Sequence, residues 1–532
     1  MRLSTRADRA DDRDGAIALI RRARSLGVRL FDTADSYGVG EADIGHNERL
    51  LAEALGDDPE GVEVVTKVGL VRPKGAWVPD GRAKHVKAAW AASVERLAPL
   101  GCPTVLLHAP DPRTKLATSL RALRGHDGPV GVSNVGLPGY RQAHELLPLH
   151  TLQVGVSVLD VSAVRGRVVG QALSDGVRVL AHSPLGGPRR AASLGRHREL
   201  VAVGARHGVS PWAVALAWLC DLGLTPLPGP TQGEHLDAIE QAMGLQLTGD
   251  DHAALFAAFP GLRWLGPDEV RPRPPTEPRA TVWFTVGAPG SGKSTWAREA
   301  RPDALRLNRD ERGGTLRGLL PPLVQAVQGG ATEVLLDNTY GTRALRAELL
   351  EAAWGAGAEA RAVWIDVPKP RCATQLVQRL LGRYGELPGP EAMKALARHD
   401  PQVLGPRALD RFLRTFEAPE DDEGMPVQRV TPPPMPSGGA PGVFVDLALR
   451  PATGDELAIG WAPHRTEPLA GRGAWCPHPP GPPVCWCRPP LPGLVLGLCH
   501  TYGLDPAAST LITTSRSLEQ LGRSLGMRLV SG

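Results

Sequence analysis

Short runs of β-branched and aliphatic residues alternate with helical patterns along the first 262 residues of this 532-residue chain. The runs predict strands at 1–4, 28–31, 62–66, 104–108, 129–133, 151–156, 177–181 and 224–228. Helical patterns lie between them, for example at 16–26, 48–55 and 86–97. Eight strands in such an alternation are typical of a closed (β/α)8 TIM barrel. An open doubly wound sheet is the alternative, but it usually carries a glycine-rich turn after its first strand, and this chain has none there.

Two Pro-rich stretches, 263–279 and 419–441, predict linkers that separate a second block, 280–418, and a third block, 442–532, from the first. We therefore expect a multidomain α/β protein. A net charge of +4 does not by itself indicate nucleic acid. No apolar stretch is long enough to span a membrane and no signal peptide is evident, so a cytoplasmic location is predicted. Seven Cys residues in so long a chain indicate thiols or a metal site rather than a disulfide framework.

In a barrel of this kind, reactive groups gather where the strands end and the loops begin. The residues at these positions are Asp32, Tyr37, Lys67, His108, Ser133, Asn134, Gln153 and Ser183. A phenol beside an ammonium ion ionises more readily, because the cation favours the phenolate, and it can protonate a carbonyl oxygen as a general acid. An Asp beside the Lys keeps the ammonium charged, and a His opposite can position the carbonyl. With a hydride donor, this set predicts carbonyl reduction.

The segments FDTADSYG, VVTKVG, LLHAPDP, GVSNVGL and LAHSPLGG follow one another in this order and resemble landmark segments of the aldo-keto reductase family, over residues 1 to about 245. The resemblance implies a catalytic set of Asp32, Tyr37, Lys67 and His108. It also implies a nicotinamide site with contributions from Ser133, Asn134, Gln153 and Ser183. The substrate would be a small carbonyl compound.

Three positions depart from the family pattern. Gly229 and His235 stand where many relatives place basic residues against the 2′-phosphate of NADPH, and Val156 stands near the usual place of an aromatic residue under the nicotinamide ring. A phosphate without Lys or Arg partners binds more weakly. NADPH is the cofactor that the family implies, and NADH is the alternative.

A second chemistry begins where an apolar run at 281–286 is followed by GAPGSGKST and a helical pattern. This is the P-loop pattern in the strand–loop–helix context that it requires, with glycines that let backbone N–H groups bind phosphates. Lys293 is expected to bridge the outer phosphates of ATP, and Ser294 to bind Mg²⁺. The predicted nucleotide-binding residues are Gly287, Gly290, Gly292, Lys293, Ser294 and Thr295.

The sequence predicts the phosphate acceptor less closely than it predicts the nucleotide-binding site. Asp310 stands where a base can take the proton of a substrate hydroxyl, and Asp337 closes another apolar strand. Arg379 and Arg383 share one helical face, where a lid can cap the phosphates.

These segments resemble the kinase domain of polynucleotide 5′-hydroxyl kinases, over residues 281 to about 400. The resemblance makes Asp310 the base for a 5′-hydroxyl and implies that Lys293, Ser294, Asp337 and Arg383 are active-site residues. An Arg of the family that binds the acceptor phosphate would fall at Gly313 here. The acceptor therefore stays open between DNA or RNA 5′ ends and a small metabolite such as a sugar or a nucleoside.

The third block contains a Pro/Gly-rich loop with four metal-ligating residues, namely Cys476, His478, Cys485 and Cys487. Four such ligands suit a tetrahedral structural Zn²⁺. The loop resembles those of phosphatases of the haloacid dehalogenase class, which use an Asp nucleophile, a second Asp two residues later, a Lys and late acidic residues. Here Asp446 is followed by Ala448, the block has no Lys, and the late segment reads LITTSRSLEQLG. We expect a catalytically inert docking or stabilising domain.

The sequence thus predicts a bifunctional protein: an NAD(P)H-dependent carbonyl reductase joined to an ATP-dependent 5′-hydroxyl nucleic-acid kinase, acting in the repair of nucleic-acid ends. The first alternative is a reductase fused to a kinase for sugars or nucleosides. The second is a nucleotide-sensing scaffold without catalysis. The sequence does not indicate an oligomeric state.

Overall fold

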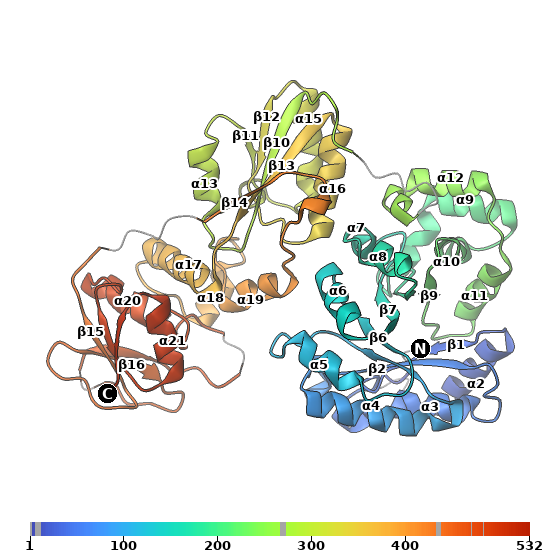
Figure 1. Cartoon of the computed structure of the whole chain (residues 1–532), viewed down its shortest axis with the longest axis horizontal. Coiled ribbons are helices and arrows are strands. Elements are labelled where there is room, and N and C mark those ends of the chain that lie inside the picture. The colour runs from blue at the N-terminus through green and yellow to red at the C-terminus, as the bar shows by residue number, and fades with distance from the viewer. Residues whose placement is uncertain (1–2, 6–11, 266–272, 432–437, 470, 482–483) are drawn as a thin grey trace. The chain divides into compact units, whose positions relative to one another are not determined.

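A computed structural model describes residues 3–5, 12–265, 273–431, 438–469, 471–481 and 484–532 (Figure 1). The chain divides into two compact units, Met1–Arg271 and Pro272–Gly532. The boundary falls within the predicted linker 263–279, of which residues 266–272 lie outside the described part.

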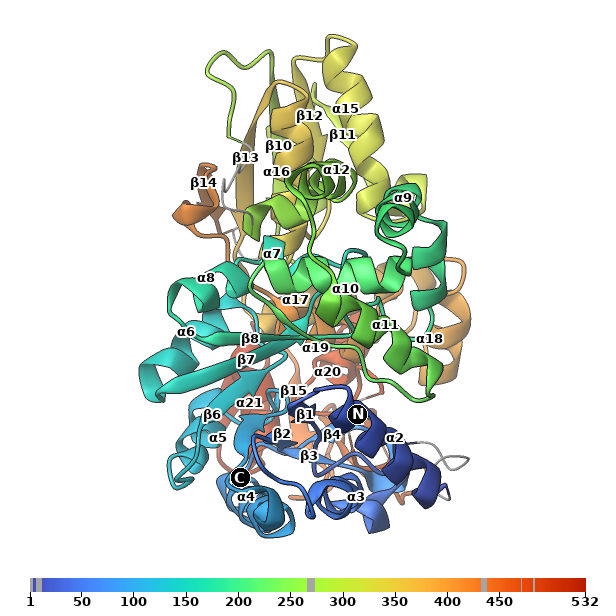
Figure 2. The same ribbon diagram turned by 90° about the vertical axis from the view of Figure 1, so that its right-hand side faces the viewer.

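The first unit is built on a parallel sheet in the order β1-β2-β5-β6-β7-β8-β9 (Figure 2). The strands are β1 (Leu30–Asp32), β2 (Glu63–Val68), β5 (Thr104–Leu107), β6 (Val130–Ser133), β7 (Leu149–Gly155), β8 (Arg178–His182) and β9 (Thr225–Leu227). A separate hairpin pairs β3 (Leu70–Val71) with β4 (Val78–Pro79). Leu30 of β1 and Leu227 of β9, at the two edges of the sheet, pack on the same buried cluster. The sheet is therefore curled into a nearly closed barrel, as the alternation of strands and helices predicts.

The strand predicted at 1–4 is not formed by the residues that the structure describes there. Leu3 and Ser4 lie in a turn, and residues 1–2 lie outside the described part. The Leu3 N–H and the Ser4 hydroxyl both donate to Asn47 Oδ1, each at 3.2 Å. The prediction was wrong for Leu3 and Ser4 because a side-chain oxygen, rather than a neighbouring strand, satisfies this backbone.

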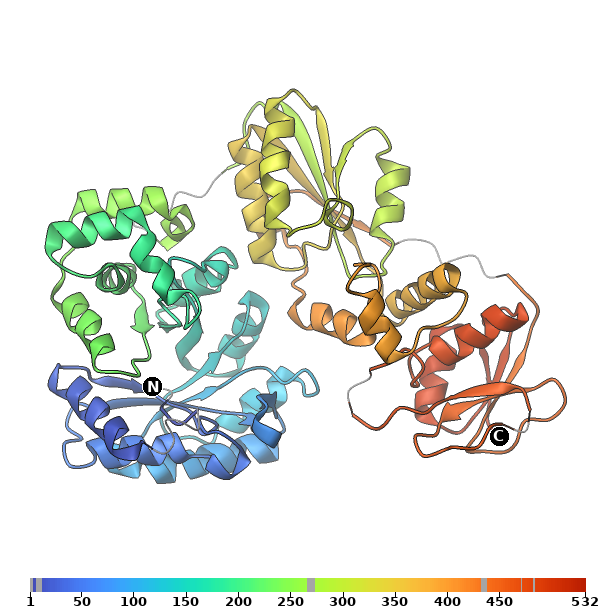
Figure 3. The ribbon, with the colours of Figure 1, turned by 180° about the vertical axis from the view of Figure 1, so that it is seen from behind.

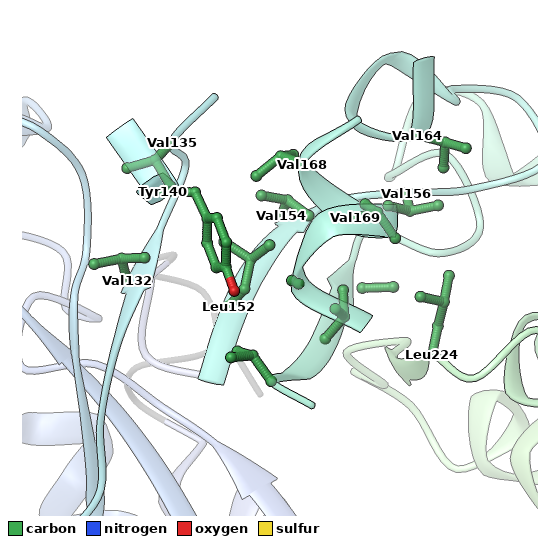
Figure 4. Close-up of a cluster of buried hydrophobic side chains, with 14 of the residues drawn as sticks. Val132, Val135, Tyr140, Leu152, Val154, Val156, Val164, Val168, Val169 and Leu224 are labelled. Carbon is green, nitrogen blue, oxygen red and sulfur yellow. The ribbon is translucent and has the colours of Figure 1, made fainter. Parts of the chain in front are cut away.

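Helices cover the outside of the barrel. They are α2 (Arg13–Ser25), α3 (His46–Leu55), α4 (Ala83–Leu97), α5 (Leu116–Leu123), α6 (Leu137–Leu146), α7 (Ser162–Arg165), α8 (Val168–Ser174), α9 (Arg198–His207), α10 (Pro211–Asp221), α11 (Glu234–Gly244) and α12 (Gly249–Ala258). Figure 4 shows the ring of Tyr140 from α6 between Val132 of β6 and Leu152 of β7, and Val168 of α8 facing Val154. Because both faces of a parallel sheet are buried, its strands are nearly continuous apolar runs, which is why they could be predicted.

Among the described residues, no single helix is long and apolar enough to cross a membrane. The helices α9 and α10 meet the criterion only together, across a bend of 91°.

The second unit contains two sheets. The first is parallel, in the order β11-β12-β10-β13-β14. Its strands are β10 (Ala280–Val286), β11 (Leu305–Leu307), β12 (Glu333–Leu336), β13 (Ala358–Ile365) and β14 (Val427–Val430). The accompanying helices are α13 (Lys293–Ala300), α14 (Arg309–Arg312), α15 (Leu320–Gln328), α16 (Arg343–Gly355), α17 (Lys369–Tyr384), α18 (Pro390–Leu396) and α19 (Pro406–Thr415).

The predicted linker 419–441 overlaps this sheet. Strand β14 pairs with β13, so the first part of the linker belongs to the fold; residues 432–437 lie outside the described part. The acidic residues here are ion-pair partners of α16. Arg346, which is fully buried, donates to Glu423 at 2.7 and 2.8 Å, and Arg343 donates to Glu420 at 2.7 Å.

The other sheet of the second unit is parallel, in the order β17-β16-β15-β18-β19 (Figure 3). Its strands are β15 (Val443–Asp446), β16 (Leu457–Trp461), β17 (Gly473–Cys476), β18 (Thr510–Ile512) and β19 (Arg528–Val530), with helices α20 (Gly493–Tyr502) and α21 (Arg516–Ser524). The strand order reverses direction between β15 and β18, and open α/β sheets form their ligand crevice at such a point. One buried cluster holds side chains from α17 and α20, so the predicted second and third blocks form one compact unit.

Candidate functional site

The predicted barrel residues meet at the carboxyl ends of the strands. Lys67 of β2 is 1% exposed, and its Nζ donates to Asp32 Oδ1 and to the Thr33 carbonyl, both at 2.6 Å. The same Nζ lies 5.0 Å from the centre of the Tyr37 ring. Burial alone would lower the pKa of Lys67, but the Asp32 carboxylate and a hydrogen bond with Tyr37 raise it above its usual value. Lys67 is therefore a charged ammonium held against the phenol.

His108 completes this set. Its ring lies edge-on to the Tyr37 ring, with centroids 5.9 Å apart, and its Nδ1 is 3.4 Å from the Ser36 hydroxyl. A third ring, Trp77, lies 6.1 Å from Tyr37 and 6.3 Å from His108. Trp77 is 43% exposed, so it forms an outer wall beside the phenol. Trp77 could not be predicted as part of this site, because it lies in the loop of the β3–β4 hairpin rather than at the end of a barrel strand.

The predicted cofactor residues lie on the same rim. Gln153 Nε2 donates to Asp32 Oδ1 at 2.6 Å, which joins β7 to β1 across the barrel. Asn134 Nδ2 donates to the Ser133 hydroxyl and to the His108 carbonyl, both at 3.0 Å. Asn134 and Ser183 have positive φ of 57° and 54°, backbone conformations that are rare outside glycine and gather at functional sites. These hydroxyl and amide groups fit the carboxamide of a nicotinamide.

The segment 229–235, near the expected 2′-phosphate position, contains neither Lys nor Arg. Gly229 has φ 63°, and His235 Nδ1 accepts the Thr231 N–H at 3.2 Å. The nearby Arg22 of α2 reaches Gly233, and its Nη2 donates to Asp237 Oδ1 at 3.0 Å.

Asp35 was not singled out from the sequence, although it lies two residues before Tyr37. Its carboxyl is buried, and Oδ1 has no hydrogen-bond partner in the described part of the chain. Burial, together with the nearby Glu48 carboxylate, raises the pKa of Asp35 to about 8. Asp35 is therefore held as a neutral acid over most of the physiological range.

The phosphate-binding loop joins β10 to α13. Gly287, Gly290 and Gly292 have φ of 154°, 77° and 94°, and a Cβ on Gly290 would lie 2.5 Å from the Cys372 carbonyl oxygen. Only glycine fits this loop where it packs on α17. Lys293 Nζ donates to the Ala288 carbonyl at 2.6 Å, and burial lowers the pKa of Lys293 to about 8. The exposed Thr295 follows on α13.

A carboxylate and a hydroxyl meet beside this loop. The Ser294 hydroxyl donates to Asp337 Oδ1 at 3.1 Å. Arg306 Nη2 and Asn308 Nδ2 donate to Asp337 Oδ2 at 2.8 and 3.0 Å. Hydroxyl and carboxylate oxygens next to a phosphate loop fit Mg²⁺. The sequence reasoning missed Arg306, which looks like one of many surface Arg residues until the fold places β11 beside β12.

Asp310 lies at the start of α14, with its N–H bonded to Asn308 Oδ1 at 2.7 Å and its carboxylate paired with Arg309 Nη2 at 2.7 Å. The pKa of Arg379 is lowered by partial burial, which the nearby Asp310 carboxylate counteracts. Arg379, a residue of α17, also lowers the pKa of Lys293, so its charge acts on the phosphate loop as well as on Asp310. Arg383 instead pairs with Asp400 Oδ2 at 2.9 Å.

The four predicted metal ligands converge. The sulfur and nitrogen ligand atoms of Cys476, His478, Cys485 and Cys487 all lie within 4.8 Å of one another. Cys476 Sγ is 3.6 Å from Cys485 Sγ, and His478 Nδ1 is 3.4 Å from Cys476 Sγ and 3.3 Å from Cys487 Sγ. Such spacings are those of ligands around one tetrahedral ion.

Asp446 ends β15 at the point where the strand order reverses. Thr513, just after β18, donates its hydroxyl to Asp446 Oδ2 at 2.7 Å, and the Ala448 N–H donates to Oδ1 at 3.0 Å. At this end of β15, the two oxygens of the Asp446 carboxylate thus accept hydrogen bonds from a hydroxyl and from a backbone amide.

Comparison with known proteins separates two regions. Residues 1–258 match the Aldo/keto reductase family, and residues 282–419 match an AAA domain. Similar curated proteins include "Uncharacterized oxidoreductase Mb2320" of Mycobacterium bovis and "Uncharacterized oxidoreductase Rv2298" of Mycobacterium tuberculosis. Each is 32% identical over 278 residues, which cover 46% of this chain and 82% of the relative.

Two solved structures are similar to the barrel. One is the glycerol dehydrogenase AKR11B4 from Gluconobacter oxydans, at 22% identity over 49% of this chain and 88% of that chain, with a TM-score of 0.41. The other is the thermostable aldo-keto reductase Tm1743 in complex with the inhibitor epalrestat, at 24% identity over 46% and 88%, with a TM-score of 0.40.

Proposed function

Because this chain belongs to the aldo/keto reductase family, we propose that its first unit reduces a small aldehyde or ketone with NADPH or NADH. The observation that carries this proposal is the buried Lys67 ammonium, 2.6 Å from Asp32 Oδ1 and 5.0 Å from the Tyr37 ring. The bound nicotinamide cofactor supplies a hydride to the carbonyl carbon. Tyr37 donates its proton to the carbonyl oxygen, because the Lys67 ammonium stabilises the phenolate that remains. His108 holds the carbonyl oxygen toward the phenol.

A steady-state assay tests the reductase. Consumption of NADPH or NADH with an aldehyde is followed for the wild type, Tyr37→Phe and Tyr140→Phe. Tyr140 is a matched control, since its hydroxyl bonds Asp175 at 2.9 Å in the helical layer. Tyr37→Phe is expected to lower kcat by about 10²- to 10⁴-fold, the usual worth of a general acid. Full activity in Tyr37→Phe, or an equal loss in Tyr140→Phe, refutes the assignment.

The proposal on cofactor preference rests on the segment 229–235, which contains neither Lys nor Arg. The nearby Arg22 pairs with Asp237, so we propose that the 2′-phosphate is held weakly and that NADH competes well with NADPH. His235→Arg is expected to lower KM for NADPH and to leave KM for NADH unchanged.

For the second unit we propose ATP-dependent phosphorylation of a 5′-hydroxyl on DNA or RNA, in the repair of nucleic-acid ends. The AAA domain and the geometry of the glycine loop support nucleotide binding. Asp310 takes the proton of the acceptor hydroxyl. The oxygen of that hydroxyl bonds to the γ-phosphorus of ATP, and the bond between the γ-phosphorus and the oxygen that leaves with ADP breaks. Ser294 and Asp337 would hold Mg²⁺, and Lys293 and the Arg379/Arg383 pair would stabilise charge on the transferred group.

Phosphate transfer from labelled ATP separates the acceptors. The substrates are a 5′-hydroxyl oligonucleotide, a nucleoside and a sugar, each with the wild type, Lys293→Ala, Asp310→Asn and the exposed-site control Asp303→Asn. Labelled oligonucleotide from the wild type and from Asp303→Asn alone supports the nucleic-acid kinase. If only the nucleoside or the sugar is labelled, the nucleic-acid kinase proposal is wrong and the protein is a metabolite kinase. If ATP binds but no phosphate is transferred to any acceptor, the result favours a nucleotide-sensing scaffold.

We propose that the third block is an inert phosphatase-like domain with a structural Zn²⁺ on Cys476, His478, Cys485 and Cys487. The proposal rests on four ligand atoms within 4.8 Å of one another and on the lone Asp446, whose carboxylate is bonded by Thr513 and Ala448. Metal analysis is expected to give one zinc per chain, and none in a Cys476→Ser/Cys485→Ser variant.

A further inference from the structure

The zinc-ligand loop carries a buried tryptophan that reaches the kinase-like part of the second unit. Trp486 lies between Cys485 and Cys487 and is 2% exposed. Its indole Nε1 donates to the Leu404 carbonyl at 3.0 Å. Leu404 belongs to the connection between α18 and α19, some 80 residues earlier in the chain. A single side chain therefore ties the loop to the connection 397–405.

The packing around Trp486 is close. Trp486 shares one buried cluster with Leu380 and Leu381 of α17 and Val495 of α20. A Cβ on Gly493, at the start of α20, would lie 2.6 Å from Leu387 Cδ2 and 2.7 Å from the Trp486 backbone. Trp486 is thus packed in one buried cluster with α17 and α20, and packed interiors rearrange rather than compress.

The connection 397–405 also binds the end of α17 that carries Arg383. Asp400 Oδ2 accepts Arg383 Nη1 at 2.9 Å and the Tyr384 hydroxyl at 3.1 Å, both from the last turn of α17. Its Oδ1 accepts the Gln402 N–H at 3.0 Å, and its carbonyl accepts the Val403 N–H at 3.1 Å, next to Leu404. A continuous path of bonds thus runs from the zinc-ligand loop to α17.

The opposite end of α17 contacts the phosphate loop. The carbonyl of Cys372, in the first turn, fills the space where a Cβ on Gly290 would lie. Arg379, midway along the helix, is electrostatically coupled both to Asp310 and to Lys293. Any shift of α17 therefore moves a cation relative to the base and the phosphate site.

We propose that Trp486 is a positioning residue for phosphoryl transfer, and that a zinc-loaded loop Cys476–Cys487 sets the place of the α17 arginines through it. The inert third block then acts as an intramolecular regulator: bound Zn²⁺ fixes the loop, Trp486 fixes the connection 397–405, and Asp400 fixes Arg383 and Tyr384. This proposal rests on the proposed kinase function and on the proposed zinc site.

The first test uses the full chain with Trp486→Phe, and with Trp475→Phe as the matched control. Trp475 lies in β17 of the same block, and its indole nitrogen has no hydrogen-bond partner among the described residues, so the control removes no such bond. Trp486→Phe is expected to keep its zinc, its reductase rate and its KM for ATP, and to lose about fivefold in kcat for phosphate transfer, the effect of one hydrogen bond. Wild-type kcat in Trp486→Phe, or an equal loss in Trp475→Phe, overturns the proposal.

The second test does not depend on catalysis. Hydrogen–deuterium exchange of α17 and of residues 397–405 is compared in the full chain with bound Zn²⁺ and after a chelator selective for zinc over magnesium. Faster exchange after chelation, reproduced by Trp486→Ala with zinc still bound, supports the coupling. Unchanged exchange overturns it. If the wild type transfers no phosphate to any acceptor, the kinase proposal fails, and the exchange result still decides whether the loop positions α17.

Discussion

Lys293 is predicted to take up a proton when ATP binds. Burial lowers its pKa to about 8, and among the residues that the structure describes its Nζ donates to the Ala288 carbonyl and to the Ser291 hydroxyl. Phosphate charges placed within a few ångströms favour the ammonium and raise the pKa back to its ordinary range or above. At pH 8 about half of the chains carry a neutral Lys293, so ATP binding takes up about 0.5 proton per site. At pH 7 the uptake falls to about 0.1 proton, and at pH 9 it rises to about 0.9.

Calorimetry measures this uptake directly. Mg-ATP is titrated into the protein, with no acceptor present, in two buffers of equal pH and different ionisation enthalpy. The difference in binding enthalpy, divided by the difference in ionisation enthalpy, gives the number of protons exchanged. Lys293→Met is the control, and its uptake is expected to be close to zero at every pH. An uptake near zero for the wild type at pH 8, or one that persists in Lys293→Met, would show that burial does not neutralise Lys293.

Three further changes test other parts of the structure. Burial raises the pKa of Asp35 to about 8, so the folded protein keeps a proton that the unfolded chain loses once the pH exceeds the usual pKa of Asp. The free energy of unfolding, measured in urea relative to Asp35→Asn, should therefore fall by about 2.7 kcal/mol from pH 5 to 7. Parallel pH profiles of the two proteins contradict this. Arg346→Leu leaves Glu423 buried without its partner, and the Tyr340 and Glu417 carbonyls without their donor, and should cost about 3–5 kcal/mol. Adding Glu423→Leu should recover the part that comes from the unpaired carboxylate, so a double variant whose loss is the sum of the two single losses contradicts the pairing. Thr513→Asp sets a second carboxylate beside Asp446 and should lower the melting temperature. Added Mg²⁺ should raise the melting temperature of this variant more than that of the wild type, in which Ser294 and Asp337 can also bind the ion, and an equal response of the two proteins contradicts this.

The meeting of polar residues at one rim of the barrel could be predicted because these residues sit at the ends of recognisable strands. Lys67 lies in an apolar run, and Asp32 ends another, so their meeting at one edge follows from the parallel arrangement. The bond between Gln153 and Asp32 is different: the two residues are 121 positions apart and touch only because the sheet curls. Trp77 could not be found, since it projects from a hairpin that belongs to no barrel strand.

The acidic segment near residue 420 was misjudged for a physical reason. Pro and clustered acids favour a solvated linker when nothing neutralises the charges. Here Arg343 and Arg346, more than 70 residues earlier, supply the neutralising groups, and Arg346 is fully buried. A sequence pattern records the acids and the arginines separately, and only the fold shows that they pair.

The hydrogen bonds around Asp446 support the proposal that the third block is an inert phosphatase-like domain. Several carboxylates around one crevice repel one another and need a cation to stay together. With Thr513 and the Ala448 N–H as partners, both oxygens of Asp446 are hydrogen-bonded without any added charge. Under the proposal, the third block needs no Mg²⁺ beside Asp446 and binds one metal ion, Zn²⁺, on the loop that carries Trp486. The hydrogen bond from Trp486 to the Leu404 carbonyl would then link zinc binding to the connection 397–405.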